Sequence, residues 1–173
     1  MGIGNPTLRE YLSVLERYGS YMGRKIDEGK LFKVYRRVQV NPNGSYNLYI
    51  DNSTSDSDVI ISILIIEADG KASINVYKDV NINSYGSEVT PEPFVIGDEL
   101  TIATKFYENV DYSGGVLIDG GQIQSTRGRR GIGGDQEFNV FFKIRAGKSL
   151  LIEVENLDSV SIRVDVKLIA HEG

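Results

Sequence analysis

From residue 31 onward, apolar and polar residues alternate in short runs that end at turn-forming residues. Alternation with a period of two is typical of β-strands that bury one face. The run 59–68 is almost continuously apolar, which indicates a central strand. The pattern predicts strands over residues 31–40, 46–50, 59–68, 72–80, 99–107, 116–123, 137–145, 149–155 and 160–169.

The connections between these runs are of two kinds. Asn43-Gly44 is a strong hairpin turn, whereas residues 81–98 and 108–115 form longer connections. About nine strands with no helix between them argue against parallel βαβ units and favour a sandwich. The mixture of short and long connections favours a Greek-key jelly roll. We therefore predict an all-β fold, a jelly-roll-like β-sandwich of about eight to nine antiparallel strands over residues 31–173, preceded by one N-terminal α-helix.

That helix is predicted over residues 5–28 by a different periodicity. Asn5 is a suitable N-cap, Pro6 suits the first helical position, and Gly29 suits the end. Apolar residues recur at intervals of three and four, which places them on one face of a helix. This apolar stripe consists of Leu8, Tyr11, Leu12, Leu15, Tyr18 and Met22.

Residues 1–30 are therefore expected to dock or oligomerise the protein. A helix of this length is marginal alone in water and needs a packing partner. The partner could be its own sandwich, sister subunits or another protein. The apolar stripe spans two heptads and fits a short bundle, for which we expect a trimer.

Composition restricts the chemistry that the chain can carry. The net charge of −5 argues against a general nucleic-acid binder. The sequence has no cysteine, which excludes disulfides and thiolate metal sites. Its one histidine, His171, is two residues from the end and is expected in a poorly ordered tail. A metal-dependent jelly-roll enzyme needs several histidines, so we expect no enzyme activity, no bound metal and no cofactor.

The N-terminal residues show no basic segment followed by an apolar run, so we expect no signal peptide. The longest apolar stretch, in residues 59–66, is interrupted by Ser62 and is too short to span a membrane. No membrane partner is expected.

Two loops could bind ligands. Residues 51–58 hold closely spaced carboxylates and hydroxyls, which suit calcium, although a solvated loop is the favoured interpretation. Arg127, Arg129 and Arg130 form a basic loop that could bind an anion or an acidic partner, or simply contact another subunit. The ten tyrosines suit packing on sheets and helix, while exposed ones would suit sugar or protein contacts.

The order of turns and strands over about residues 32–172 resembles the jelly-roll structural proteins of tailed bacteriophages, namely head-fibre, decoration and tail-associated proteins. Residues 1–30 have no counterpart in the shortest members. Three parts of the chain carry the resemblance. The first is residues 40–45 with the following strand 46–50, and the second is residues 74–77 with 86–91. The third is residues 144–147 and 149–156, together with a last strand that ends at 170–172.

The resemblance implies a virion structural protein that is displayed on a capsid or tail surface and acts by self-assembly and adhesion. Its expected partners are further copies of itself, other virion proteins and a host surface glycan or receptor, and its expected location is the virion. The alternative is a carbohydrate- or receptor-binding β-sandwich module. That alternative predicts a row of exposed aromatic side chains along one sheet.

Overall fold

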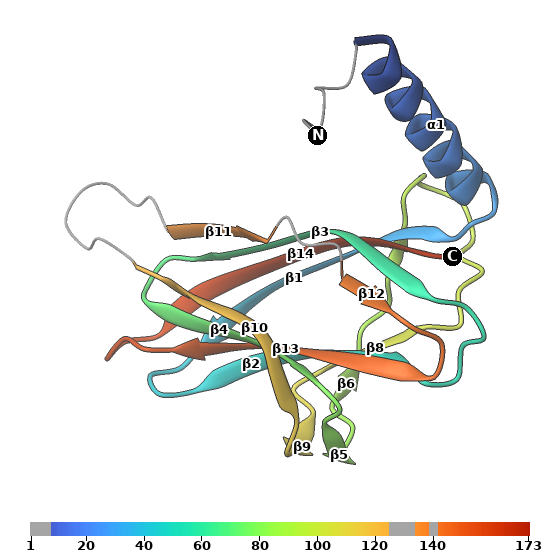
Figure 1. Cartoon of the computed structure of the whole chain (residues 1–173). Coiled ribbons are helices and arrows are strands. Elements are labelled where there is room, and N and C mark those ends of the chain that lie inside the picture. The colour runs from blue at the N-terminus through green and yellow to red at the C-terminus, as the bar shows by residue number, and fades with distance from the viewer. Residues whose placement is uncertain (1–7, 125–133, 139–141) are drawn as a thin grey trace, which may run out of the picture.

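The chain folds into two antiparallel sheets that face each other, with one helix outside them (Figure 1). This computed structural model describes residues 8–124, 134–138 and 142–173. The helix, α1, spans Leu8–Asp27, and Gly29 ends it in a left-handed conformation with φ of 65°. The predicted cap residues Asn5 and Pro6 lie outside the described residues.

The first sheet has three long strands side by side, with shorter strands at both edges. β11 and β12 occupy one edge, where both pair with β3, and β7 pairs with β1 at the other edge. The members in spatial order are β11 (Gly134–Phe138) and β12 (Phe142–Ile144), β3 (Val59–Ala68), β14 (Ile162–Glu172), β1 (Leu31–Val40) and β7 (Glu92–Pro93).

The second sheet has four long strands side by side and two short strands at one edge, and a small third sheet lies on its outer face. The second sheet contains, in spatial order, β10 (Val116–Ile123), β4 (Ala72–Lys78), β13 (Lys148–Asn156), β2 (Ser45–Asn52), β8 (Lys105–Glu108) and β6 (Ser87–Glu88). The third sheet pairs β5 (Asn81–Ser84) with β9 (Asp111–Ser113).

The strand order is that of a jelly roll. Successive strands alternate between the sheets, with β1 and β3 in the first and β2 and β4 in the second. The pairs are nested: β1 with β14, β2 with β13, β3 with β11 and β12, and β4 with β10. Two interlocked Greek keys produce this nesting. The predicted all-β sandwich with one N-terminal helix is confirmed.

One contiguous core fills the space between the two large sheets. Leu48 and Ile50 of β2 and Leu64 and Ile66 of β3 all belong to this core, and all four side chains are fully buried. Residues between them point outward, as the period of two requires. Each such side chain contributes about 1.5–3 kcal/mol on burial, so the core holds the two sheets together.

Several predicted strand limits were wrong. Residues 99–104 are not a strand; β8 begins at Lys105, and the N–H groups of Ala103 and Thr104 donate to the Glu172 carboxylate instead of to a neighbouring strand. The connection 81–98 contains β5, β6 and β7, which are too short to show a period. The predicted strand 137–145 is divided into β11 and β12, and residues 139–141 lie outside the described part.

The expectation of a poorly ordered tail at His171 was also wrong. β14 continues to Glu172 between β1 and β3, and His171 pairs with Leu31. His171 is only 2% exposed, and Tyr21 of α1 packs against its ring. Within the described residues, no helix has the length and apolar character to span a membrane.

Candidate functional site

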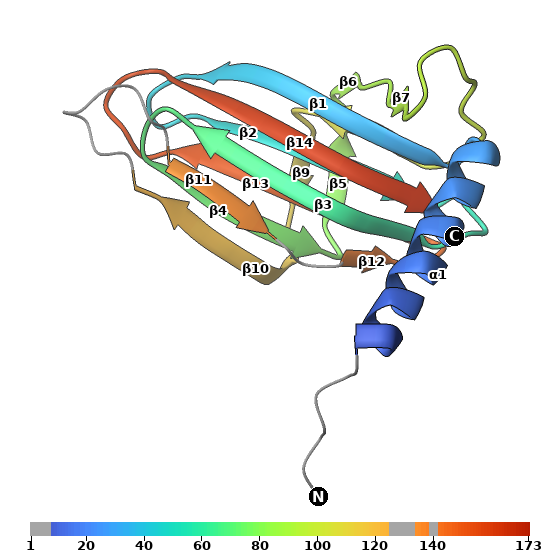
Figure 2. The same ribbon diagram turned by 90° about the horizontal axis from the view of Figure 1, so that it is seen from above.

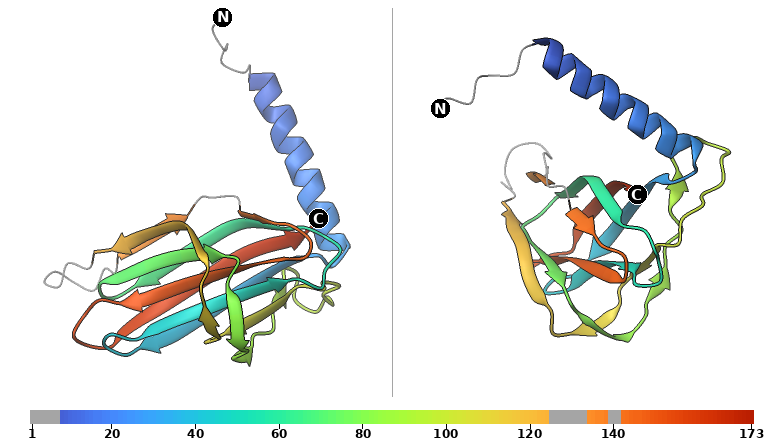
Figure 3. Two further views of the ribbon diagram at one scale, coloured as in Figure 1. Left: turned by 60° about the horizontal axis from the view of Figure 1, so that its bottom comes forward. Right: turned by 45° about the vertical axis from the view of Figure 1, so that its right-hand side comes forward.

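The helix α1 projects from one end of the sandwich, and its N-terminal end lies away from both sheets (Figures 1 and 3). Its C-terminal end is fixed by backbone contacts. Thr101 donates from Oγ1 to the Glu28 carbonyl at 2.6 Å and from its N–H to the Gly29 carbonyl at 3.0 Å. The N–H of Glu172 donates to the carbonyl of Lys30 at 3.2 Å. The base of the helix is therefore part of the sandwich.

One side-chain contact ties α1 to the last strand. A hydrogen bond of 3.1 Å joins Tyr21 Oη and His171 Nε2, and the two rings meet edge to face with centroids 5.4 Å apart. Arg24 and Lys25 each place a cation 5.6 Å from the centre of the Tyr21 ring. Burial, and secondarily the charge of Lys25, lowers the pKa of His171. The histidine is therefore held in its neutral form.

Met22 is the member of the apolar stripe whose side chain lies in the described part of the chain. Consecutive helical residues are about 100° apart around the axis, so Met22 is turned away from Tyr21 by that angle. Met22 is half-buried. The backbone of the other stripe members is helical as predicted, but their side chains lie outside the described part of the chain: Leu8, Tyr11, Leu12, Leu15 and Tyr18.

An apolar loop tip lies at the same end of the sandwich. Phe94, Val95 and Ile96 follow β7 and are 45%, 42% and 95% exposed. The same loop continues to residues 98–101, which line a shallow hollow together with residues 26–29 at the end of α1. Figure 2 shows this loop reaching the base of the helix. The loop that carries this apolar tip therefore lies beside the base of α1.

A row of aromatic and apolar side chains crosses the outer face of the second sheet. Tyr77, Leu151, Tyr49 and Tyr107 lie opposite one another on four adjacent strands. Burial raises the pKa of Tyr49 and of Tyr77. This is the kind of row that a sugar-binding module needs, but Leu151 is fully buried and Tyr49 is 5% exposed.

The small third sheet covers this row. Val110, Ile82 and Tyr112 from the β5 and β9 region pack against it. Tyr85 adds a ring whose centroid lies 4.6 Å from that of Tyr107, and it is the exposed member of the group, at 55%. Most of these tyrosines therefore pack the sheets together, and Tyr85 is the ring available to a partner.

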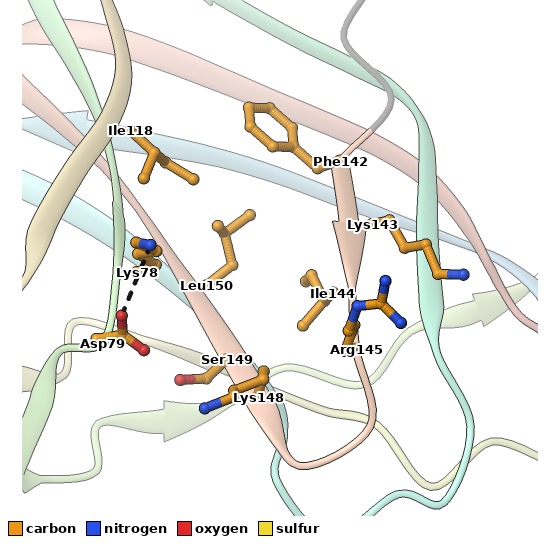
Figure 4. Close-up of a pocket in the computed structure, with 10 residues that line it drawn as sticks. All are labelled: Lys78, Asp79, Ile118, Phe142, Lys143, Ile144, Arg145, Lys148, Ser149 and Leu150. Atoms are coloured by element: carbon orange, nitrogen blue, oxygen red, sulfur yellow. Dashed lines mark ion pairs between the residues drawn. The ribbon is translucent and has the colours of Figure 1, made fainter.

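A pocket of about 380 Å³ opens between β12 of the first sheet and the strands β4, β10 and β13 of the second (Figure 4). Ile118, Phe142, Ile144 and Leu150 form its apolar part. Polar and charged side chains surround this apolar part: Lys78, Asp79, Lys143, Arg145, Lys148 and Ser149. Its members come from three separate segments of the chain, residues 78–79, 118 and 142–150, so no local motif could have revealed it.

The structure separates the carboxylates of the loop 51–58. Asp58 accepts from Lys143 Nζ at 2.7 Å and from the N–H of Ala146 at 3.0 Å, and Lys143 is the main cause of its lowered pKa. Asp51 Oδ1 accepts from the N–H of Ser53. Among the described residues, no three His, Asp or Glu side chains are grouped as a metal site.

The other predicted ligand loop cannot be placed. Arg127, Arg129 and Arg130 lie outside the described residues. Their role in binding an anion or a partner stays a prediction.

Comparisons with known proteins assign no family. A crystal structure of a mitogen derived from Yersinia pseudotuberculosis is similar over 79% of this chain and 83% of its own, with 8% sequence identity and a TM-score of 0.39. A likeness at that score carries no argument about function. No protein-family model matches the sequence, and no curated protein matches it either.

Proposed function

We propose that this chain is a virion structural protein that self-assembles through α1 and displays its jelly roll on a capsid or tail surface. The observation that carries the proposal is the position of the helix. α1 leaves the sandwich at its base, and its N-terminal turns, over which the sequence predicts the apolar stripe, lie away from both sheets.

A projecting helix needs a partner for a physical reason. Helices of this length are marginal in water, and most helical stability in proteins comes from packing of an apolar face. The described contacts with the sandwich involve the C-terminal turns, from Tyr21 to Gly29. The remaining length of the helix is best stabilised by other helices.

Further copies of the same chain are the simplest partner. The three- and four-residue spacing of the stripe fits the interface of a short bundle, and three copies would form the trimer predicted from the sequence. The exposed tip Phe94–Val95–Ile96 lies at the base of the helix and would face a neighbouring subunit in such an assembly. Closed symmetric assemblies are the common form of soluble homo-oligomers.

The virion setting rests on the resemblance of residues 32–172 to phage jelly-roll proteins. A fold alone does not specify function, because jelly rolls serve many roles. The fold does supply what display requires, namely a rigid sandwich. In this arrangement the turns 41–44 and 157–161, at the end of the sandwich away from α1 (Figure 1), face outward.

The test compares the mass in solution of two double variants by light scattering. Leu12→Glu with Leu15→Glu places two charges in the apolar stripe, and an oligomer held by the stripe dissociates into monomers. Ser13→Glu with Ser20→Glu adds the same charge on the opposite side of the helix, and this control keeps the mass of the natural chain. Equal masses for both double variants, at the value of the natural chain, refute assembly through the stripe.

A further inference from the structure

We propose that the pocket between β12 and the second sheet binds a small organic anion with an apolar body. The pocket lies on the sandwich itself, so the inference does not rest on assembly through α1. It rests on an apolar floor that belongs to the core, a rim of four cations of which two have no ion pair among the described residues, and a volume suited to a small molecule.

The floor of the pocket is formed in advance. Ile144 and Leu150 are each 4% exposed and belong to the main core, and Phe142 packs against that core. Ile118 of β10 adds an exposed apolar side chain at 42%. Because the sandwich fixes these residues, an apolar group entering the pocket would leave water without first requiring the core to rearrange.

The rim carries an excess of positive charge. Lys143 is paired with Asp58 at 2.7 Å, and Lys78 reaches Asp79 only at 4.0 Å. Arg145 and Lys148 are exposed, and within the described residues neither has an ion pair. A local cluster of cations on a chain with a net charge of −5 attracts anions to this one place.

Figure 4 shows how the two halves of the pocket are arranged. Phe142, Ile118 and Leu150 lie on one side, Lys148 lies at the turn between β12 and β13, and the guanidinium of Arg145 lies beside the end of β12, on the side of Lys143. A ligand with its acid group near this turn and its hydrocarbon part on the floor would contact both the cations and the apolar side chains. The guanidinium of Arg145 suits a carboxylate, which it can bind through two parallel N–H donors.

The volume of the pocket limits the size of the ligand that it can hold. About 380 Å³ lies within the range of small-molecule pockets, roughly 300–1,000 Å³, and exceeds what a bare inorganic anion fills. A nucleic-acid strand would need a basic groove that follows many phosphates, which a single pocket does not provide. A medium-chain carboxylate is therefore the fitting class.

Three probes separate the contributions to binding when titrated into the full chain by calorimetry. Octanoate has the acid group and the apolar body, octanol has the body alone, and acetate has the acid group alone. Octanoate is expected to bind at least about tenfold more tightly than octanol, a difference of about 1.4 kcal/mol, and acetate is expected not to bind. Failure of octanoate to bind up to about 10 mM, or equal binding of octanol, would overturn the proposal.

Two variants locate the site. Arg145→Gln with Lys148→Gln removes the two cations that have no ion pair, and octanoate affinity should fall at least about tenfold. Lys71→Gln, at the other end of β4 and also exposed, is the control and should bind octanoate as the natural chain does. Thermal unfolding of both variants checks that the fold is intact. Unchanged affinity in the double variant, or amide shifts on octanoate binding that avoid Ile118, Ser149 and Leu150, would place the ligand elsewhere and refute the assignment.

Discussion

The hydroxyl of Tyr21 lies 3.1 Å from Nε2 of His171, and this contact joins the helix to the last strand across 150 positions of sequence. The histidine is 2% exposed, and its Nδ1 has no hydrogen-bond partner among the described residues. An uncharged imidazole fits this site, whereas a charged one would face the ammonium group of Lys25 nearby. Protonation of His171 would therefore weaken this one contact, while the backbone hydrogen bonds at the base of α1 do not involve it.

The lowered pKa of His171 makes stability depend on pH in a defined window. In the unfolded chain a histidine takes up a proton near pH 6.5, whereas the folded chain keeps His171 neutral to lower pH. In this range the unfolded state binds more protons than the folded state. The free energy of unfolding should therefore decrease as the pH is lowered from about 7 to about 5. Urea unfolding at a series of pH values measures it.

The matched variant for this prediction is His171→Gln, which keeps a polar side chain but does not titrate. Its stability should change less than that of the natural chain over the same window. Asp58 and Asp165 have lowered pKa values, held down chiefly by Lys143 and Arg37, and their contribution is lost only below about pH 4. Identical pH dependence in the variant and the natural chain would show that His171 is not the titrating group.

Glu172 should stabilise the fold although it is the penultimate residue. Its Oε1 accepts hydrogen bonds from the N–H groups of Ala103 and Thr104 at 2.8 and 2.7 Å. Glu172→Ala leaves these donors without an acceptor and should lower the free energy of unfolding by about 2–3 kcal/mol. Glu172→Gln keeps an acceptor oxygen and should cost about 1 kcal/mol. A loss below about 0.5 kcal/mol for the alanine variant would mean that the carboxylate does not hold this loop.

Gly86 is required where the chain crosses over β8. A Cβ atom there would collide with the carbonyl oxygen of Glu108 and lie 2.6 Å from that of Asn109. Gly86→Ala should therefore cost about 1–3 kcal/mol and displace Tyr85 from the Tyr107 ring. Ser87→Ala, at an exposed neighbour, should have little effect in the same unfolding measurement. Equal stability of the two variants would contradict the close crossing.

Two tyrosines should ionise late when the pH is raised. Burial, with Glu108 next in importance, raises the pKa of Tyr46, and burial together with the bond to Glu153 raises that of Tyr112. Unfolded tyrosines lose their protons near pH 10, so the unfolded state binds fewer protons above that pH. Stability should then fall as the pH rises past about 10.

The ultraviolet absorbance of tyrosinate measures this ionisation directly. In the natural chain, part of the increase in tyrosinate absorbance should appear only at the pH at which the chain unfolds. Tyr112→Phe should make that part of the increase smaller. Complete titration of all ten tyrosines near pH 10 in a chain that remains folded would rule the prediction out.

The sequence predicted the long strands well because each carries its own alternation. β1, β3 and β10 have the limits expected from the pattern, and Gly29 ends the helix as expected. The short strands β5, β6, β7 and β9 were not predicted. They have too few residues to show a period, and their positions depend on tertiary pairing with β8 and β1 and on packing against Tyr49 and Leu151.

The candidate sites were harder to predict than the fold. The apolar stripe of α1 is a local pattern that can be predicted from the sequence, and its role in assembly stays a prediction. The pocket is not a local pattern in the sequence. Lys78, Ile118 and Arg145 line one pocket only after β4, β10 and the turn after β12 have come together in the fold. His171 was misjudged from its distance to the chain end, which says nothing about the sheet position of the strand that carries it.

The mass of the natural chain in solution tests most directly whether this is a self-assembling display protein. Light scattering over a range of protein concentrations measures it. Assembly through α1 predicts one discrete species at three times the chain mass of 19.2 kDa, stable on dilution. A folded monomer at every concentration would contradict self-assembly and leave a monomeric binding module as the better description.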